Sequence, residues 1–178
     1  MSRYKKRNIK IAILGGTFDP PHIGHLHISQ IALKKLKLDK ILWIVTKKNP
    51  FKKKPYFNIK KRIQFSKKIT KNEKKIHVKY FDSKIKSSKT FDLISYLKKR
   101  NKKAKLFFLM GADNFVKFHK WNKWKKISYL AKIVVFARQN YTRKSLKSIA
   151  SQKLNKKDWI YIDSKKVNIS SSLIRKFW

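Results

Sequence analysis

The chain has 178 residues, of which 42% are hydrophobic, so it is long enough for one domain, residues 1–178, with a core of its own. It contains no cysteine, which excludes disulfide bonds and thiolate metal sites. No apolar run approaches the roughly 20 residues that a membrane-spanning helix needs. We therefore expect a cytoplasmic protein with no membrane partner.

The charge is strongly positive, because 49 Lys and Arg residues stand against 8 Asp and Glu residues, which gives a formal net charge of +41. A dedicated nucleic-acid site usually clusters its basic residues and favours arginine for bidentate phosphate contacts. Here the excess is lysine, and it is spread through every segment. This pattern favours compositional drift, with nonspecific nucleic-acid binding expected from charge alone.

Short apolar runs alternate with amphipathic stretches along the chain. The runs predict strands at residues 10–14, 40–46, 75–81, 105–110, 133–137 and 159–162. The amphipathic stretches predict helices at residues 24–38, 58–69, 90–99, 112–118, 123–131, 142–150 and 171–177. Alternation of this kind predicts an α/β fold, a Rossmann-like doubly wound parallel sheet with helices on both faces. Ligands of such sheets bind beyond the carboxyl ends of the strands.

The first predicted strand leads into residues 15–25, with the sequence GGTFDPPHIGH. Gly15 and Gly16 allow backbone amides to approach a ligand closely. His22 and His25 are three residues apart, so both rings can face one anion near the first turn of the next helix. A single histidine or a Gly-Gly pair is more often a surface residue or a turn, but this order of elements indicates a phosphate site.

Two polar residues of the same segment have different expected roles. The hydroxyl of Thr17 lies beside the glycine turn and can donate to a phosphate. Asp19 precedes Pro20, and we interpret it as a residue that forms the loop through local hydrogen bonds of its carboxylate rather than as a general base.

Residues 15–25 resemble the signature of the nucleotidyltransferase superfamily that carries the [Thr/His]-x-Gly-His motif. Residues 169–175, ISSSLIR, are similar to the second signature of that superfamily, Ile-Ser-Ser-Thr-x-Ile-Arg. Its members transfer an adenylyl or cytidylyl group to a phosphate or a carried acid. The two motifs therefore predict both ends of one active site, and the resemblance covers nearly the whole chain.

For the first motif the resemblance implies contacts with the α- and β-phosphates of ATP. It assigns the catalytic role to Thr17, His22 and His25, and it places Gly15 and Gly16 in the same ATP site. Phosphoryl transfer needs mainly alignment and neutralisation of charge, so hydroxyl, imidazole and amide donors are sufficient for this chemistry.

For the second motif the resemblance implies contacts with the β- and γ-phosphates, which leave as pyrophosphate. The residues concerned are Ser170, Ser171 and Arg175. Considered alone, the serines would be interpreted as the ordinary N-cap of a helix.

The middle of the chain carries the substrate prediction. Residues 110–124 contain Gly-Ala-Asp-Asn followed by Phe-His-x-Trp, which is similar to the bacterial nicotinate-nucleotide adenylyltransferases. The resemblance implies that Gly111 and Asp113 hold the ribose of ATP and that Trp121 stacks on the pyridine ring. Core packing is the alternative for a tryptophan at helical spacing, and we expect it for Trp124.

Three further residues carry weaker assignments. Lys52 lies in a segment that resembles a family loop and is a candidate cation near the phosphates. Thr90 resembles a residue near the nicotinate, but it could equally cap a helix whose dipole Asp92 complements. Arg138 is expected near the nucleotide, although Gln139 stands where the family commonly has proline.

Together these features predict an adenylyltransferase that transfers AMP from ATP to nicotinate mononucleotide and makes deamido-NAD and pyrophosphate without a covalent intermediate. No carboxylate cluster suggests a metal held by the protein, so Mg²⁺ is expected to arrive on ATP. The nearest alternative is pantetheine-phosphate adenylyltransferase, which shares both end motifs. An RNA-binding protein on an inactive nucleotidyltransferase fold is the alternative from another class.

Overall fold

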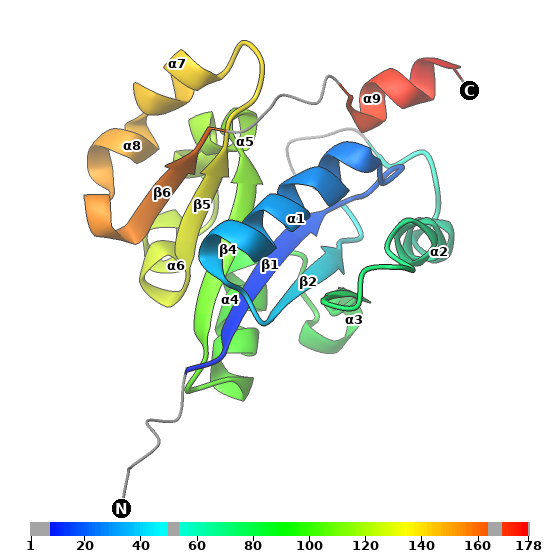
Figure 1. Cartoon of the computed structure of the whole chain (residues 1–178), viewed down its shortest axis with the longest axis horizontal. Coiled ribbons are helices and arrows are strands. Elements are labelled where there is room, and N and C mark those ends of the chain that lie inside the picture. Colours follow the sequence, from blue (N-terminus) through cyan, green and yellow to red (C-terminus); the bar gives the residue numbers. More distant parts are fainter. Residues whose placement is uncertain (1–7, 50–53, 164–168, 178) are drawn as a thin grey trace, which may run out of the picture.

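The computed structural model describes residues 8–49, 54–163 and 169–177. Its centre is a six-stranded parallel sheet (Figure 1). Every predicted strand is present, although several ends differ by one or two residues. The strands are β1 (Lys10–Gly16), β2 (Lys40–Val45), β3 (Ile76–Lys79), β4 (Lys105–Gly111), β5 (Lys132–Phe136) and β6 (Trp159–Ile162).

The strand order is β3-β2-β1-β4-β5-β6, so the direction of winding reverses between β1 and β4. The register places Leu14 of β1 beside Leu109 of β4, so the carboxyl ends of these two strands reach the same edge of the sheet. Open α/β sheets bind ligands in the crevice at such a switch point. The topology confirms the predicted Rossmann-like fold class.

Helices connect the strands, and most of them match the predicted segments. They are α1 (Ile23–Leu36), α2 (Ile59–Ile69), α3 (Asp82–Ile85), α4 (Thr90–Arg100), α5 (Ala112–Val116), α6 (Trp124–Leu130), α7 (Thr142–Leu146), α8 (Ile149–Lys153) and α9 (Ser171–Ile174). Single 3₁₀ turns are η1 (Phe118–Lys120), η2 (Lys156–Asp158) and η3 (Arg175–Phe177).

The prediction of one helix over residues 142–150 is wrong, because α7 and α8 are separate. Ser148 has extended backbone angles, and its hydroxyl accepts a hydrogen bond from the backbone N–H of Ser151 at 3.2 Å. An N-cap of this kind begins a new helix rather than continuing the old one. The short helix α3 was not predicted from the sequence.

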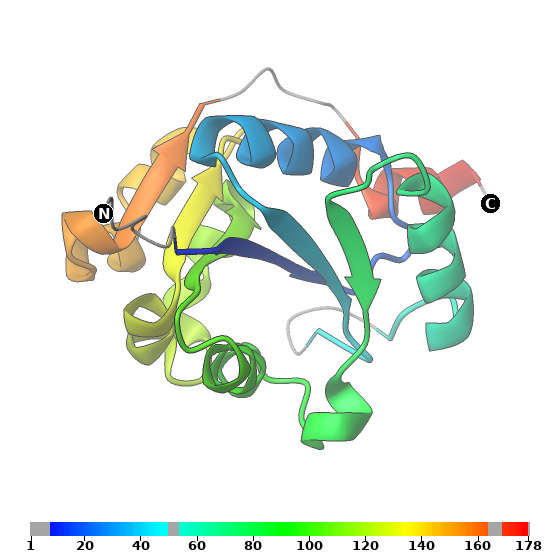
Figure 2. The same ribbon diagram turned by 60° about the horizontal axis from the view of Figure 1, so that its bottom comes forward.

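Alternate residues of each central strand point to opposite faces of the sheet, and each face has its own core. On β1, Ile11 and Ile13 belong to one buried cluster, whereas Ala12 and Leu14 belong to the other. Figure 2 shows α1 on one face of the sheet and α4 on the other. This double covering fixes the sheet rigidly and leaves the carboxyl ends of the strands as the place for a site. In the described ranges, no helix is both long and apolar enough to cross a membrane.

Candidate active site

Two adjoining cavities lie at the carboxyl edge of the sheet. The larger cavity has a volume of about 530 Å³ and the smaller one about 370 Å³. Gly15, Gly16, Asn49, Phe108 and Trp121 line both cavities, so the cavities meet at the end of β1. The phosphate site expected after the first strand is therefore the junction of two compartments.

The larger cavity brings together motifs that are about 150 residues apart in the sequence. The residues predicted to bind ATP all line it, and they are Gly15, Gly16, Thr17, His22, His25, Gly111, Asp113, Arg138, Ser170, Ser171 and Arg175. They come from the ends of β1, β4 and β5, from the start of α1 and from the region of α9.

The rings of His22 and His25 lie against each other, with centroids 3.8 Å apart and planes inclined by 35°. His22 is the N-cap of α1, and its backbone N–H donates to Nδ1 of His25 at 3.2 Å. Because Nδ1 accepts this hydrogen bond, the ring proton of neutral His25 lies on Nε2. The two imidazoles and the N-terminus of a 14-residue helix therefore meet at one place, which suits a bound anion.

Gly24 allows the close fit of His22 against the start of α1. A Cβ atom added at Gly24 would lie 2.9 Å from Nδ1 of His22, 3.0 Å from its Cε1 and 3.2 Å from Cγ2 of Ile169. Real Cβ atoms essentially never come that close to a ring nitrogen. The glycine of the His-x-Gly-His motif is therefore needed for space rather than for an unusual backbone conformation.

A closed set of contacts with buried residues holds His25 in place. Its ring packs on Phe18, with centroids 4.9 Å apart, and Phe18 stacks on Trp43 at 4.9 Å. Nε1 of Trp43 donates to Oγ of Ser29 at 2.9 Å, and that hydroxyl donates to the backbone carbonyl of His25 at 2.8 Å. Both the ring and the backbone of His25 are thus fixed to the same buried group, which leaves the ring little freedom to rotate.

The segment around α9 is attached to the loop that precedes α1. The hydroxyl of Ser171 donates to the carbonyl of Pro20 at 2.7 Å, and Nη1 of Arg175 donates to the carbonyl of Asp19. Ser170 is the N-cap of α9 and accepts from the backbone N–H of Leu173 at 3.1 Å. The serine expected to cap this helix is therefore Ser170, whereas Ser171 joins the two motifs.

Asp19 forms the loop, as expected, but its partners are distant in the sequence. Its carboxylate is buried and accepts hydrogen bonds from the backbone N–H groups of Tyr56, at 2.7 Å, and Phe57, at 2.9 Å. Nη1 of Arg175 lies 3.6 Å from the same carboxylate. The expectation of local hydrogen bonds is corrected: Asp19 joins the first motif to the segment before α2.

Asp113 and Arg138 form an ion pair at the other end of the larger cavity, with Nη1 and Oδ2 2.6 Å apart. The second carboxylate oxygen, Oδ1, is buried without a hydrogen-bond partner among the described residues. A Cβ atom at Gly111 would lie only 2.6 Å from that oxygen. Gly111 therefore makes room for this oxygen to lie against the end of β4, while Asp113 as a whole lines the larger cavity.

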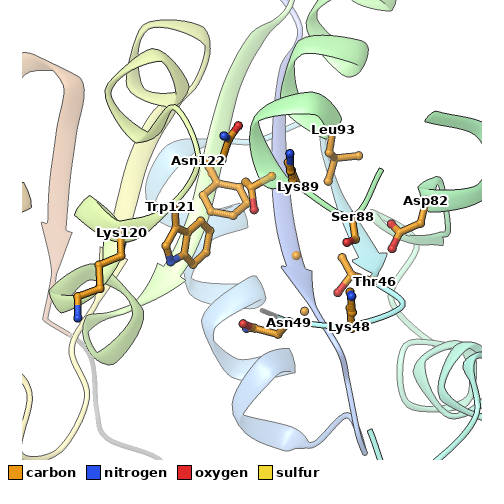
Figure 3. A pocket seen from close by; sticks show the side chains of 14 residues that line it. Thr46, Lys48, Asn49, Asp82, Ser88, Lys89, Leu93, Lys120, Trp121 and Asn122 are labelled. Carbon is orange, nitrogen blue, oxygen red and sulfur yellow. The ribbon is translucent and has the colours of Figure 1, made fainter. Parts of the chain in front are cut away.

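The smaller cavity lies on the β2 side of the switch point (Figure 3). Trp121 and Asp82 stand on opposite sides of it, with Ser88 beside Asp82. The ring of Trp121 contacts Phe108 and Phe118 edge to face, with centroids 6.1 and 5.4 Å apart. Its Nε1 is buried without a partner in the part of the chain that is described. Trp121 therefore forms a wall of both cavities.

Trp124, in contrast, packs against the hydrophobic core and lines neither cavity, as the core-packing alternative expected.

Thr90 also lines the smaller cavity, at the first position of α4. The N-cap residue of that helix is Lys89, so the alternative that Thr90 caps the helix is wrong. Asp92 lies in the first turn of α4 and accepts a hydrogen bond from the hydroxyl of Ser87 at 2.6 Å. Lys52, the candidate cation, lies outside the described residues.

Two buried charged residues at the site were not predicted. Arg62 of α2 donates to backbone carbonyls behind both cavities, and Asp82 accepts a hydrogen bond from the backbone N–H of Lys47 at 2.7 Å. Burial raises the pKa of the Asp82 carboxyl, while the Lys47 amide and the Arg62 cation act in the opposite direction. One signal could have found Arg62: it is an arginine in a chain whose basic residues are almost all lysine.

A parallel sheet whose switch point carries a His-x-Gly-His helix start defines a nucleotidyltransferase. The chain belongs to the cytidylyltransferase-like family, whose model matches residues 13–177. In particular, it is similar to a protein of Pelagibacter ubique (strain HTCC1062) named "Probable nicotinate-nucleotide adenylyltransferase". The two are 51% identical over 171 residues, which make up 96% of this chain and 94% of the relative.

More distant relatives agree. A Mesorhizobium japonicum protein with the same name is 30% identical over 97% of this chain and 97% of its own length. The nicotinic acid mononucleotide adenylyltransferase of Plasmodium falciparum, solved in complex with NaAD, has a TM-score of 0.80 at 21% identity. That match covers 96% of this chain and 84% of the solved one, and it shows the fold. These comparisons confirm the resemblance that the motifs predict.

Proposed function

We propose that this protein transfers an adenylyl group from ATP to nicotinate mononucleotide, giving deamido-NAD and pyrophosphate. The observation that carries the proposal is the meeting of two cavities at Gly15 and Gly16, with the histidine pair in one and Trp121 between them. The larger cavity accepts ATP and the smaller one accepts the mononucleotide. Their junction is where the two reacting phosphates meet.

The reaction is a direct in-line displacement at the α-phosphate. A phosphate oxygen of the mononucleotide attacks the α-phosphorus, the bond to the bridging oxygen breaks, and pyrophosphate leaves. The protein has to align the two phosphates and stabilise the charge that spreads over the α-phosphate oxygens. Nε2–H of His25, the His22 ring and the Thr17 hydroxyl are the donors at this position, held by the contacts beneath His25.

The leaving pyrophosphate faces the segment around α9. Arg175 is held by the carbonyl of Asp19 and by Oγ of Ser172, at 3.2 Å, so its charge lies at the mouth of the larger cavity. Asp113 lines the same cavity and pairs with Arg138, and its partly exposed carboxylate can accept a hydrogen bond from a ribose hydroxyl. ATP therefore lies across the cavity between these two groups.

Mg²⁺ enters as part of the MgATP substrate. In the described ranges, no group of three or more His, Cys, Asp or Glu side chains is arranged to hold a metal ion. A cation that bridges the triphosphate oxygens needs waters and substrate rather than a protein cage.

The smaller cavity suits a flat pyridinium ring that carries a carboxylate. Trp121 offers an aromatic face, and Lys48 and Lys89 line the same cavity, so a ring with a carboxylate is favoured over a ring with an uncharged carboxamide. The hydroxyl of Thr90 adds a hydrogen-bonding group at the start of α4.

The test is pyrophosphate release from MgATP with nicotinate mononucleotide, nicotinamide mononucleotide and phosphopantetheine, measured side by side with the purified protein. We expect the fastest release with nicotinate mononucleotide. Release with phosphopantetheine alone would instead identify a pantetheine-phosphate adenylyltransferase. No release with any of the three, together with binding to RNA, would favour an inactive fold that binds nucleic acid.

A further inference from the structure

Arg62 is the buried cation on which the loops of the site converge. It lies on α2 with a side chain that is only 2% exposed. Its Nη1 donates to the carbonyls of Thr17, at 2.6 Å, and Thr46, at 2.7 Å. Its Nη2 donates to the carbonyl of Lys47 at 3.1 Å, and its Nε donates to that of Phe57 at 3.0 Å. One guanidinium thus joins three separate segments of the chain.

These segments form different walls of the two cavities. Thr17 follows β1 and lines the larger cavity, whereas Thr46 follows β2 and lines the smaller one. The two carbonyls accept hydrogen bonds from the same nitrogen of Arg62, so the loops after β1 and β2 are held at a fixed separation behind the site.

Two buried carboxylates strengthen the same arrangement. Asp19 accepts the backbone N–H groups of Tyr56 and Phe57, and Asp82 accepts that of Lys47. Both carboxylates attract the Arg62 cation, which offsets part of the loss of hydration that lowers the pKa of this guanidinium. Lys47 and Phe57 are therefore each held at two backbone groups, the N–H by a carboxylate and the carbonyl by Arg62.

Only arginine can make this set of contacts. The guanidinium presents five N–H donors in a planar fork, whereas the lysine ammonium presents three donors from one point. A lysine at this position would keep the positive charge but could not reach the carbonyls on all three segments. The arrangement therefore depends on the geometry of the side chain as well as on its charge.

We propose that Arg62 is a positioning residue of the adenylyl transfer: it fixes the two substrate cavities relative to each other, so that the mononucleotide phosphate meets the α-phosphate in line. This inference rests on the proposed function. Each cavity has its own walls and binds its own substrate without Arg62, but the approach of the two phosphates depends on it. A mutation far from the reacting atoms that misplaces the substrates by about 1 Å can lower the rate about 100-fold.

The test compares Arg62→Lys and Arg62→Gln with the wild type and with Arg100→Lys, an exposed arginine at the end of α4. Calorimetry measures binding of a non-hydrolysable ATP analogue and of nicotinate mononucleotide, each alone. Rapid quench measures one turnover at saturating concentrations of both substrates. Urea unfolding measures stability.

We expect Arg62→Lys to bind each substrate within about threefold of the wild type while the single-turnover rate falls about 100-fold. Arg100→Lys should match the wild type in every measurement. An unchanged rate in Arg62→Lys would overturn the inference, and so would a loss of binding that matches the loss of rate.

Failure of both Arg62 variants to fold would also overturn it, because Arg62 would then be a folding residue. Absence of any transfer by the wild type would instead refute the proposed function, on which the inference rests.

Discussion

Replacing Gly24 by alanine should separate activity from stability. The added Cβ would lie 2.9 Å from Nδ1 of His22, whereas ordinary contacts lie at about 3.5 Å or more, so the ring must retreat by about 0.6 Å. The ring cannot move toward His25, whose centroid is already 3.8 Å away. His22 must therefore leave its position at the phosphate site.

A shift of this size should lower the rate of adenylyl transfer about 10- to 100-fold, since about 1 Å of misplacement costs about 100-fold. This corresponds to about 1.4–2.7 kcal/mol in the barrier. Stability should change little, because the preference of a helix for alanine over glycine, up to about 1 kcal/mol, offsets the cost of displacing the His22 ring.

The assay is steady-state pyrophosphate release together with urea unfolding, for Gly24→Ala and for Lys34→Ala, an exposed residue of the same helix. The double variant Gly24→Ala with His22→Ala tests the cause, because the alanine can no longer displace an imidazole. If Gly24→Ala lowers the rate further in the His22→Ala background by the same factor, the effect does not pass through His22 and the reasoning is refuted.

Three further predictions concern single side chains. His25→Ala should lower turnover by about 10²–10³ while the protein still folds, because it removes a donor to transition-state charge; near-normal turnover would contradict this. Trp121→Ala should raise the KM for the mononucleotide far more than that for ATP, since stacking contributes roughly 1–3 kcal/mol; equal increases would indicate a packing role. Burial raises the pKa of the Asp82 carboxyl above 3.8, so its contribution to stability is present at low pH and is lost as pH rises through the folded pKa. Asp82→Asn should therefore become more stable relative to the wild type as pH rises from about 4 to neutral. A constant difference in unfolding free energy between the two proteins over this pH range, measured by urea unfolding, would contradict this.

The strands were predictable because a parallel sheet buries both of its faces. Each strand therefore appears in the sequence as a short apolar run with polar residues around it. Boundaries that depend on one hydrogen bond were less visible. The break at Ser148 between α7 and α8 is an example, because a serine inside an amphipathic stretch does not reveal that its hydroxyl caps a new helix.

The larger cavity was predictable because its residues lie in short contiguous motifs, and each motif follows a strand. Arg62 and Asp82 were not, because they act on segments 5 to 45 residues away through backbone atoms, which every residue has. Composition gives one signal for Arg62, because almost all of the basic residues of this chain are lysine. Arg62 and Arg175 each donate from more than one guanidinium nitrogen at the site, and Arg138 forms the ion pair with Asp113.

The attachment of Ser171 and Arg175 to the loop at Asp19 and Pro20 has a consequence for truncated forms of the protein. In the part of the chain that the structure describes, all six strands lie before residue 163, and neither buried core includes a residue of the α9 segment. The same segment lines the larger cavity through Ser170, Ser171 and Arg175. A truncated form that stops before residue 169 should therefore fold and resist proteolysis, yet consume no ATP. Proteolytic resistance and ATP consumption then report on different parts of the chain.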